Sequence, residues 1–156
     1  MEAPDVDKRT WGPGPWQDEP DRLEWRHAGL ACLITRVPES GHLCGYVAVP
    51  PGHPVHGKDY YDGDGDGDLV DISAPGGLTY ADKCQGVVCH VPAPGEPDDV
   101  WWLGFDCAHY GDFCPAASSK FGWHEAGATY KTIEFVKAAV NLLAEQLQAK
   151  EAPGIA

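Results

Sequence analysis

Basic residues are scarce in this chain of 156 residues. Lys and Arg together number 11 against 24 Asp and Glu, which gives a formal net charge of -13 at pH 7. The basic side chains are scattered from Lys8 to Lys150 and form no stripe or block. Because proteins neutralise phosphates with clustered Lys or Arg, this scarcity argues against nucleic-acid binding. An anionic small ligand would need a local cation, a nest of backbone N–H groups or a divalent metal.

Long apolar runs are also missing. No stretch approaches the roughly 20 apolar residues of a membrane span, and residues 1–5 lack the basic and apolar regions of a secretory signal. We therefore predict a cytoplasmic protein without a membrane partner, in which cysteines are most simply reduced thiols and disulfides are the alternative. The six cysteines are Cys32, Cys44, Cys84, Cys89, Cys107 and Cys114.

Apolar residues are plentiful enough for one core, at 43% of the chain. Apolar runs at residues 31–37 and 43–50, separated by a turn that contains Pro38 and Gly41, predict a β-hairpin. Apolar spacing of three and four residues from Ile133 to Leu147, after a cap at Thr129 or Thr132, predicts one long helix across a face of the sheet. Further short strands are predicted at residues 69–72, 78–81, 86–91 and 100–105.

Strands followed by a single long helix predict an α+β fold: one domain with a mostly antiparallel sheet and the C-terminal helix packed on a face. We place this domain at residues 30–150 and a short tail at 151–156. Residues 1–29 are rich in Pro, Gly and Trp. This composition predicts an arm packed over the domain. We expect no regular element before residue 20 and a short helical or strand-like piece near residues 20–26. We expect residues 113–128 to form an irregular segment that crosses between the last strand and the long helix.

Residues 100–115 join the densest aromatic run of the chain to a cluster of Asp, His and Cys. If the strand ends near Phe105 and Asp106 caps a turn, Asp106 and His109 fall on one side and Asp112 can close around them. That arrangement suits an acid/base pair or a divalent metal, so these three residues are the candidate catalytic residues. If the strand continues through residue 109, Asp106 and His109 point to opposite faces. The structural alternative is that Asp106 only caps and His109 only bonds a buried carbonyl group.

The spacing of Asp residues in one segment, and of Cys and His residues in another, allows two hypotheses for a metal site. Asp62, Asp64 and Asp66 are spaced as in a calcium loop, but Ser73 stands where an EF-hand has a bidentate Glu, and a solvated acidic turn is the alternative. A zinc site could draw on the cysteines and histidines between residues 84 and 114. No Cys-x-x-Cys pair supports it, and buried thiols are favoured.

Paired glycines at Gly76 and Gly77 predict a loop whose backbone N–H groups are open to a ligand oxygen. His56, Lys58 and Tyr80 could complete such a pocket by adding polar side chains. A tight turn between strands is the alternative for the glycine pair. The sequence also has neither a Gly-x-Ser-x-Gly elbow nor a phosphate loop, so serine hydrolases and nucleotide triphosphatases lack support.

Several segments, in this order, give the chain a specific resemblance to a family of small uncharacterised proteins of tailed bacteriophages and prophages, from about residue 9 to residue 147. They include Gly-His-Leu-Cys-Gly-Tyr-Val at 41–47, Gly-His-Pro-Val-His-Gly-Lys at 52–58, Gly-Gly-Leu-Thr-Tyr at 76–80 and Gly-Phe-Asp-Cys-Ala-His-Tyr-Gly-Asp at 104–112. The resemblance implies one pocket shared by Asp106, His109, Asp112 and the glycine loop. Members of this kind often have His where this chain has Pro75.

Two functions of different classes follow as expectations. In the first, a phage accessory protein in the host cytoplasm binds a small polar or nucleotide-like ligand in a pocket at the strand ends. It sequesters this ligand, or hydrolyses it with the help of a metal such as Ca²⁺ or Zn²⁺, to counter host processes. In the second, a non-enzymatic acidic protein blocks a host protein through its charged surface.

Overall fold

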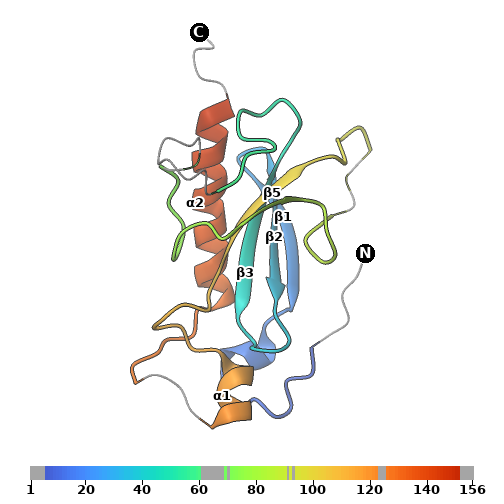
Figure 1. Cartoon of the computed structure of the whole chain (residues 1–156). Helices are drawn as coiled ribbons and strands as arrows, with labels where there is room; N and C mark the ends of the chain where they lie inside the picture. The colour runs from blue at the N-terminus through green and yellow to red at the C-terminus, as the bar shows by residue number, and fades with distance from the viewer. Residues whose placement is uncertain are drawn as a thin grey trace.

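The centre of the protein is a five-stranded antiparallel sheet with a long helix against one face (Figure 1). The computed structural model describes residues 6–60, 69, 71–90, 92, 94–122 and 126–151. The strands are β1 (Arg22–His27), β2 (Leu30–Arg36), β3 (Leu43–Val49), β4 (Tyr80–Lys83) and β5 (Trp101–Asp106), in the spatial order β1-β2-β3-β5-β4. The helices are the 3-10 helix η1 (Pro15–Asp18), α1 (Pro115–Phe121) and α2 (Ile133–Glu151). The predicted α+β fold is confirmed.

The predicted hairpin is formed by β2 and β3. Its register places Thr35 opposite Cys44 and Ala31 opposite Ala48. Apolar residues fill both strands because both faces of this part of the sheet are covered.

Helix α2 begins at the predicted Thr132 cap and packs on β3, β2 and β1. The Phe135 backbone N–H donates to Thr132 Oγ1 at 3.2 Å, which satisfies one of the free donors of the first turn. The helix buries the predicted stripe against the sheet. Gly45 of β3 allows this close approach, because a Cβ atom there would lie 2.5 Å from Val140 Cγ2. The residues of the stripe that are fully buried are Val136, Val140, Leu143 and Leu147.

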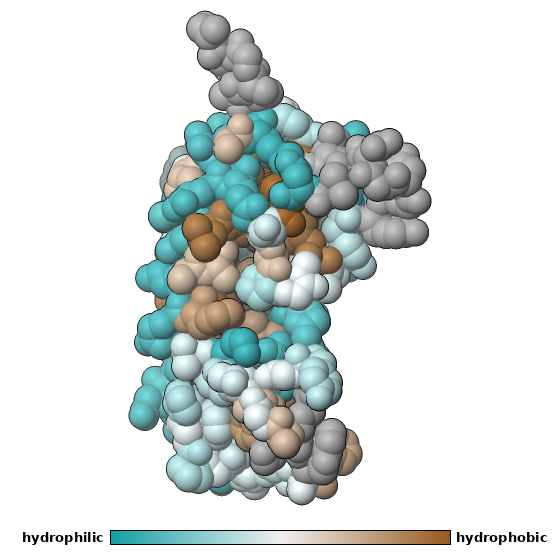
Figure 2. All heavy atoms as spheres, turned by 90° about the vertical axis from the view of Figure 1, so that its left-hand side faces the viewer, coloured by the Kyte–Doolittle hydropathy of each residue, from teal (hydrophilic) through white to brown (hydrophobic). Residues whose placement is uncertain are grey.

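The other side of α2 faces solvent. Figure 2 shows this side of the molecule, where apolar side chains lie among hydrophilic ones. Phe135 and Leu142 are the exposed large apolar residues of the helix. Among the described residues, no helix combines the length and the apolar character of a membrane span.

The second face of the sheet carries a smaller core under the connection from β4 to β5. Trp102 of β5 and Tyr46 of β3 pack there with Val88 and Val100 of the connection. A strand was predicted at residues 86–91, and the prediction is wrong for the described residues 86–90: Gln85 and Val88 form a tight turn, and a disulfide joins Cys84 to Cys89 around it.

The disulfide also corrects the prediction of reduced thiols for these two cysteines. Burial was nevertheless inferred correctly for Cys32, Cys44 and Cys107, which are free and buried. Burial raises the pKa of each of these three thiols to about 12, so they pack as small apolar side chains and not as nucleophiles.

Three other segments differ from prediction. Leu69, Asp71 and Ile72 are not in a strand, and the Ile72 N–H donates to the Leu69 carbonyl in a turn (3.2 Å). The strand predicted at 78–81 is β4, which lies two residues later. The segment 113–128 contains helix α1, which ends at Gly122 in the left-handed conformation.

The N-terminal segment lies against α1 and the chain that leads to α2. Trp11 and Trp16 are buried with Ala116, and the Trp16 ring lies 5.0 Å from the Tyr130 ring. The segment contains η1, with Pro15 in its first turn, so the prediction of no regular element before residue 20 is wrong. Residues 22–27 of the same segment form the edge strand β1.

Candidate functional site

Strand β5 stops at Asp106, and two turns follow it. Asp106 Oδ1 accepts a hydrogen bond from the Ala108 backbone N–H at 3.1 Å. The Asp112 N–H then donates to the His109 carbonyl oxygen at 2.9 Å. The strand therefore ends where a turn can bring Asp106 and His109 to one side, as the first of the two predicted arrangements requires.

His109 lies between the two carboxylates. Its Nε2 atom is 3.4 Å from Asp106 Oδ1, and its Nδ1 atom is 3.4 Å from Asp112 Oδ2. Both distances exceed those of good hydrogen bonds. The imidazole therefore lies between the two carboxylates without a strong hydrogen bond to either. Asp112 also accepts the His109 backbone N–H at 3.0 Å, which fixes the turn itself.

Each carboxylate has a further partner. Thr79 Oγ1 donates to Asp106 Oδ2 at 3.3 Å, and Lys131 Nζ lies 2.8 Å from Asp112 Oδ1. Burial favours the neutral form of Asp112, but the Lys131 ammonium and the His109 N–H outweigh it and hold the pKa of Asp112 below its usual value. Asp112 is therefore ionised at neutral pH.

Gly76 forms the surface on which the His109 ring lies. Its φ angle is +71°, and a Cβ atom there would lie 2.3 Å from His109 Cε1. Neighbouring Gly77 has a similar φ angle of +88°, but a Cβ atom on it would meet nothing within 4 Å. The Gly77 N–H closes a turn with the Ala74 carbonyl at 2.8 Å, so it is not open to a ligand as predicted. Only Gly76 of the pair is thus required by contact with the site.

Gly76, His109, Asp112 and Lys131 border a hollow of about 330 Å³, which we call the His109 hollow. Its polar side chains include His109, Asp112, Lys131 and Tyr110, and Gly76 forms part of its wall. Tyr110 lies at its edge with 94% of its surface exposed. Asp106 contacts the imidazole but is not one of the lining residues, so its place is that of a residue that orients His109.

Three of the predicted ligand-binding residues lie elsewhere. His56 bonds the Asp99 carbonyl at 2.7 Å, and its ring lies 6.0 Å from the Trp101 ring. Lys58 is close to the same residue, since its carbonyl accepts the Trp101 Nε1–H. Trp101 and Asp106 are the two ends of β5, about 17 Å apart for five strand steps. His56 and Lys58 therefore do not join the hollow, and the prediction of one shared pocket is wrong for them.

Tyr80 is in strand β4 opposite Gly104, and its ring packs edge-on against Tyr46 at 5.3 Å between centroids. It is not among the residues that line the His109 hollow. The preceding residue, Thr79, makes the contact with Asp106 instead.

The metal hypotheses find no support in the described ranges. Within them, no three His, Cys, Asp or Glu side chains are placed to hold one metal ion. Cys84 and Cys89 are joined to each other, so the zinc hypothesis loses two of its ligands. Asp62, Asp64 and Asp66 of the possible calcium loop lie outside the described residues.

Sequence reasoning missed two residues near the site. Lys131 comes from the start of the chain segment that leads into α2, and nothing in its local pattern marks it. His42 precedes β3, and the strand alternation that puts Cys44 opposite Asp106 puts His42 on the same face, next to the end of β5. Burial lowers the pKa of His42, although the nearby Asp106 and Asp112 carboxylates oppose this. His42 Nδ1 is 2.5 Å from Ser40 Oγ.

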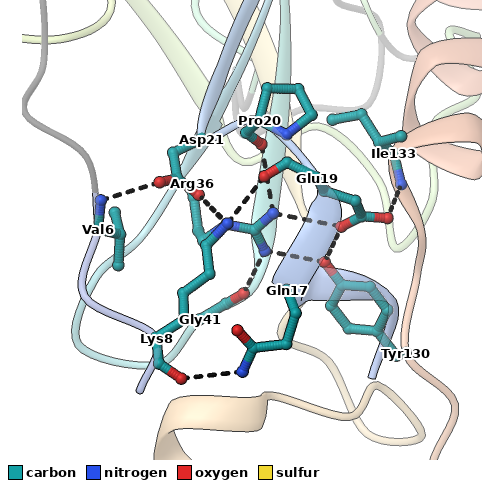
Figure 3. Close-up of polar contacts among 10 residues, drawn as sticks. All are labelled: Val6, Lys8, Gln17, Glu19, Pro20, Asp21, Arg36, Gly41, Tyr130 and Ile133. Atoms are coloured by element: carbon teal, nitrogen blue, oxygen red, sulfur yellow. Dashed lines mark hydrogen bonds and ion pairs between the residues drawn. The ribbon is translucent and has the colours of Figure 1, made fainter. Parts of the chain in front are cut away.

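A second polar centre surrounds Arg36, whose side chain is fully buried (Figure 3). Its guanidinium binds Asp21 Oδ1 at 2.7 Å, Glu19 Oε1 at 3.2 Å and the Tyr130 hydroxyl at 2.8 Å. Glu19 reaches further and accepts the Ile133 backbone N–H at the start of α2 (2.9 Å). These bonds tie the N-terminal segment to the hairpin and to α2, which makes the cluster structural.

Comparison with known proteins yields no relative: no family model, no curated protein and no solved structure matches the chain. The family resemblance described from the sequence therefore stays a prediction.

Proposed function

We propose that the protein binds a small polar ligand in the His109 hollow and that His109 exchanges a proton with it. The observation that supports this most directly is the position of the imidazole, with each ring nitrogen 3.4 Å from a carboxylate at the wall of an open hollow. An Asp–His pair of this kind can hold one tautomer and let the other nitrogen act as acid or base.

The charges of the hollow indicate what kind of ligand it takes. Lys131, its cation, is already bound to Asp112, which leaves little to attract a phosphate group. The Asp112 carboxylate, which lines the hollow, accepts hydrogen bonds only, so it favours a ligand that carries O–H or N–H groups. An uncharged hydroxyl- or amine-bearing molecule, such as a nucleoside or a sugar, fits these groups better than a nucleotide.

In the setting that the sequence resemblance implies, this is a phage protein of the host cytoplasm. Binding there removes a host metabolite or signal from use, and hydrolysis of a bound ligand is the reaction that the acid/base pair supports. The proposal gives Asp106, His109 and Asp112 a role in proton transfer, and it is supported by the fact that no three His, Cys, Asp or Glu side chains of the described residues are placed to hold one metal ion.

The experiment compares Gly76→Ala with Gly77→Ala. Both substitutions place a side chain at a left-handed φ angle, so both carry the same backbone strain, but only Gly76→Ala displaces the His109 ring. Uncharged nucleosides and sugars, with the matching monophosphates, are titrated into each protein while the ¹H–¹⁵N signals of the His109 side chain are followed by NMR. We expect an uncharged probe to shift these signals in the wild type and in Gly77→Ala, and to bind Gly76→Ala at least about tenfold more weakly.

A second pair of variants tests the proton-transfer role. His109→Gln and Asp106→Asn retain the shape of the site but remove the base or the charge that orients it. The proposal is rejected if no probe moves the His109 signals, or if Gly76→Ala binds as well as Gly77→Ala.

A further inference from the structure

Tyr110 is the most exposed large apolar residue in the part of the chain that the structure describes. It has 94% of its surface exposed, and it is one of the residues that line the His109 hollow. Single apolar side chains are common at protein surfaces, so exposure alone indicates no function. Tyr110 differs from such residues in two ways, because it borders a candidate binding site and because its backbone is held in place.

The backbone of Tyr110 is fixed although its ring is in solvent. The Asp112 N–H donates to the His109 carbonyl oxygen at 2.9 Å, which closes a turn with Tyr110 and Gly111 at its centre. Gly111 has a φ angle of +94°, and glycine readily supplies a positive φ at the third position of such a turn. The Gly111 carbonyl oxygen accepts the Thr129 N–H at 2.8 Å. A side chain on a fixed turn loses less entropy on binding than one on a mobile loop.

The hollow offers apolar surface as well as polar groups. Pro75 lines it together with Tyr110, and its volume of about 330 Å³ lies in the range of about 300–1,000 Å³ that is usual for sites of small organic ligands. The Tyr110 ring provides a flat face, on which any nucleobase can stack because every base has a π-face.

The polar side chains of the hollow place an acceptor beside a donor. The ionised Asp112 carboxylate only accepts hydrogen bonds, whereas the Lys131 ammonium has three N–H groups that only donate. Two of these groups are used by Asp112 Oδ1 at 2.8 Å and the Thr129 carbonyl oxygen at 3.3 Å. The third has no hydrogen-bond partner among the described residues. A ligand with an N–H group next to an acceptor atom therefore satisfies both residues.

We propose that the ligand of the His109 hollow is an uncharged nucleoside, whose base stacks on the Tyr110 ring and bonds Asp112 and Lys131 through its polar edge. This inference rests on the proposed function, because it names the ligand of the same site. A nucleobase has a flat face and an edge on which N–H groups stand beside acceptors. A sugar has hydroxyl groups for Asp112 but no flat ring, so of the two the nucleoside fits the hollow better.

Uridine and 5,6-dihydrouridine test the stacking. They have the same ribose and the same N–H and carbonyl groups, but saturation of the C5–C6 bond puckers the dihydro base and removes its flat face. Each is titrated into the protein while the side-chain signals of His109 and Tyr110 are recorded by NMR, with adenosine, cytidine, guanosine and methyl β-D-ribofuranoside in parallel. We expect saturable shifts of both residues with the nucleosides. Binding of 5,6-dihydrouridine and of the methyl riboside should be at least about fivefold weaker.

Variants then locate the stacking surface. Tyr110→Phe keeps the ring and should bind uridine like the wild type. Tyr110→Leu removes the ring, so it should bind uridine at least about fivefold more weakly and lose the preference over 5,6-dihydrouridine. Phe121→Leu is the control, because Phe121 is another exposed aromatic residue but does not line the hollow. Both positions are exposed, so these substitutions should leave the fold intact.

Three results would overturn the inference and leave the proposed function in place, because the His109 signals would still report a ligand. No nucleoside binds more tightly than the methyl riboside; 5,6-dihydrouridine binds as tightly as uridine; or Tyr110→Leu retains the affinity and the preference of the wild type. If no uncharged probe moves the His109 signals, the inference and the proposed function both fail.

Discussion

At the scale of the residue, Arg36 has the most demanding position in the protein. A buried guanidinium is stable only when it is paired and its donors are satisfied, because its removal from water costs several kcal/mol. Arg36 meets this condition with Glu19, Asp21, Tyr130 and the Gly41 carbonyl (Figure 3). The same bonds explain why an N-terminal segment full of Pro and Gly has a defined place on the domain.

Replacement of Arg36 by Met should therefore destabilise the protein strongly. Met fills similar space but leaves the buried Glu19 carboxylate without its cation and Asp21 with Lys8 alone, a loss of about 3–5 kcal/mol. Arg9→Met is the control, because the Arg9–Asp7 pair is exposed and such pairs contribute little. Urea unfolding followed by Trp fluorescence gives both values. Similar midpoints for the two variants would show that the Arg36 cluster does not hold the N-terminal segment.

At the scale of the element, α2 supplies one side of the main core. Two adjacent leucines show the division between its faces: Leu143 is fully buried and Leu142 is 61% exposed. Leu143→Ala removes buried apolar surface and leaves a cavity, for a loss of about 3 kcal/mol in the free energy of unfolding. Leu142→Ala should change it by less than about 0.5 kcal/mol. Thermal and urea unfolding of the pair check this, and a loss at Leu142 equal to that at Leu143 would mean that the outer face of α2 is covered in solution.

The elements that sequence predicted correctly are those with a repeated pattern. The helix repeats its apolar residues over five positions from Ile133 to Leu147, and the hairpin joins two long apolar runs. The wrong predictions concern short segments. Val88 of the 86–90 segment packs in the same core cluster as Trp102, and a disulfide and a tight turn set the shape of the segment, whereas α1 has only seven residues. Short apolar runs report burial and cannot distinguish strand from loop.

The candidate site divides in the same way. Asp106, His109 and Asp112 are close in sequence, so a single turn was enough to bring them together. The relative position of these three residues depends on the conformation of the local backbone, which the sequence can predict. Contact between His56 and this turn depended on which end of β5 the residues around His56 approach, and tertiary packing sets them at the Trp101 end. Lys131 could not be predicted from the local sequence either, because tertiary packing brings it to Asp112.

At the scale of the whole molecule, several titratable groups respond to acid in the same direction. Burial lowers the pKa of His42 and His90, while Asp21 and Asp112 have lowered pKa values because cationic partners and hydrogen bonds outweigh their burial. In each case the unfolded chain binds protons more readily than the folded protein. Stability is therefore complete above the unfolded pKa of each group and is lost as the pH falls below it.

Two stages of acid destabilisation should follow. The first begins near pH 6.5, where unfolded histidine takes up a proton that folded His42 and His90 resist, with a slope of at most about 1.4 kcal/mol per pH unit for each ring. The second begins near pH 4 and comes from Asp21 and Asp112. Urea unfolding between pH 8 and pH 3 measures both stages.

The slope between pH 7 and pH 5 should fall in a His42→Gln, His90→Phe double variant. It should also persist at high salt, because the cost of burying a charged ring is not screened as repulsion between surface carboxylates is. A flat or opposite slope in this range, or an unchanged slope in the double variant, would show that the two buried histidines do not set the response to acid.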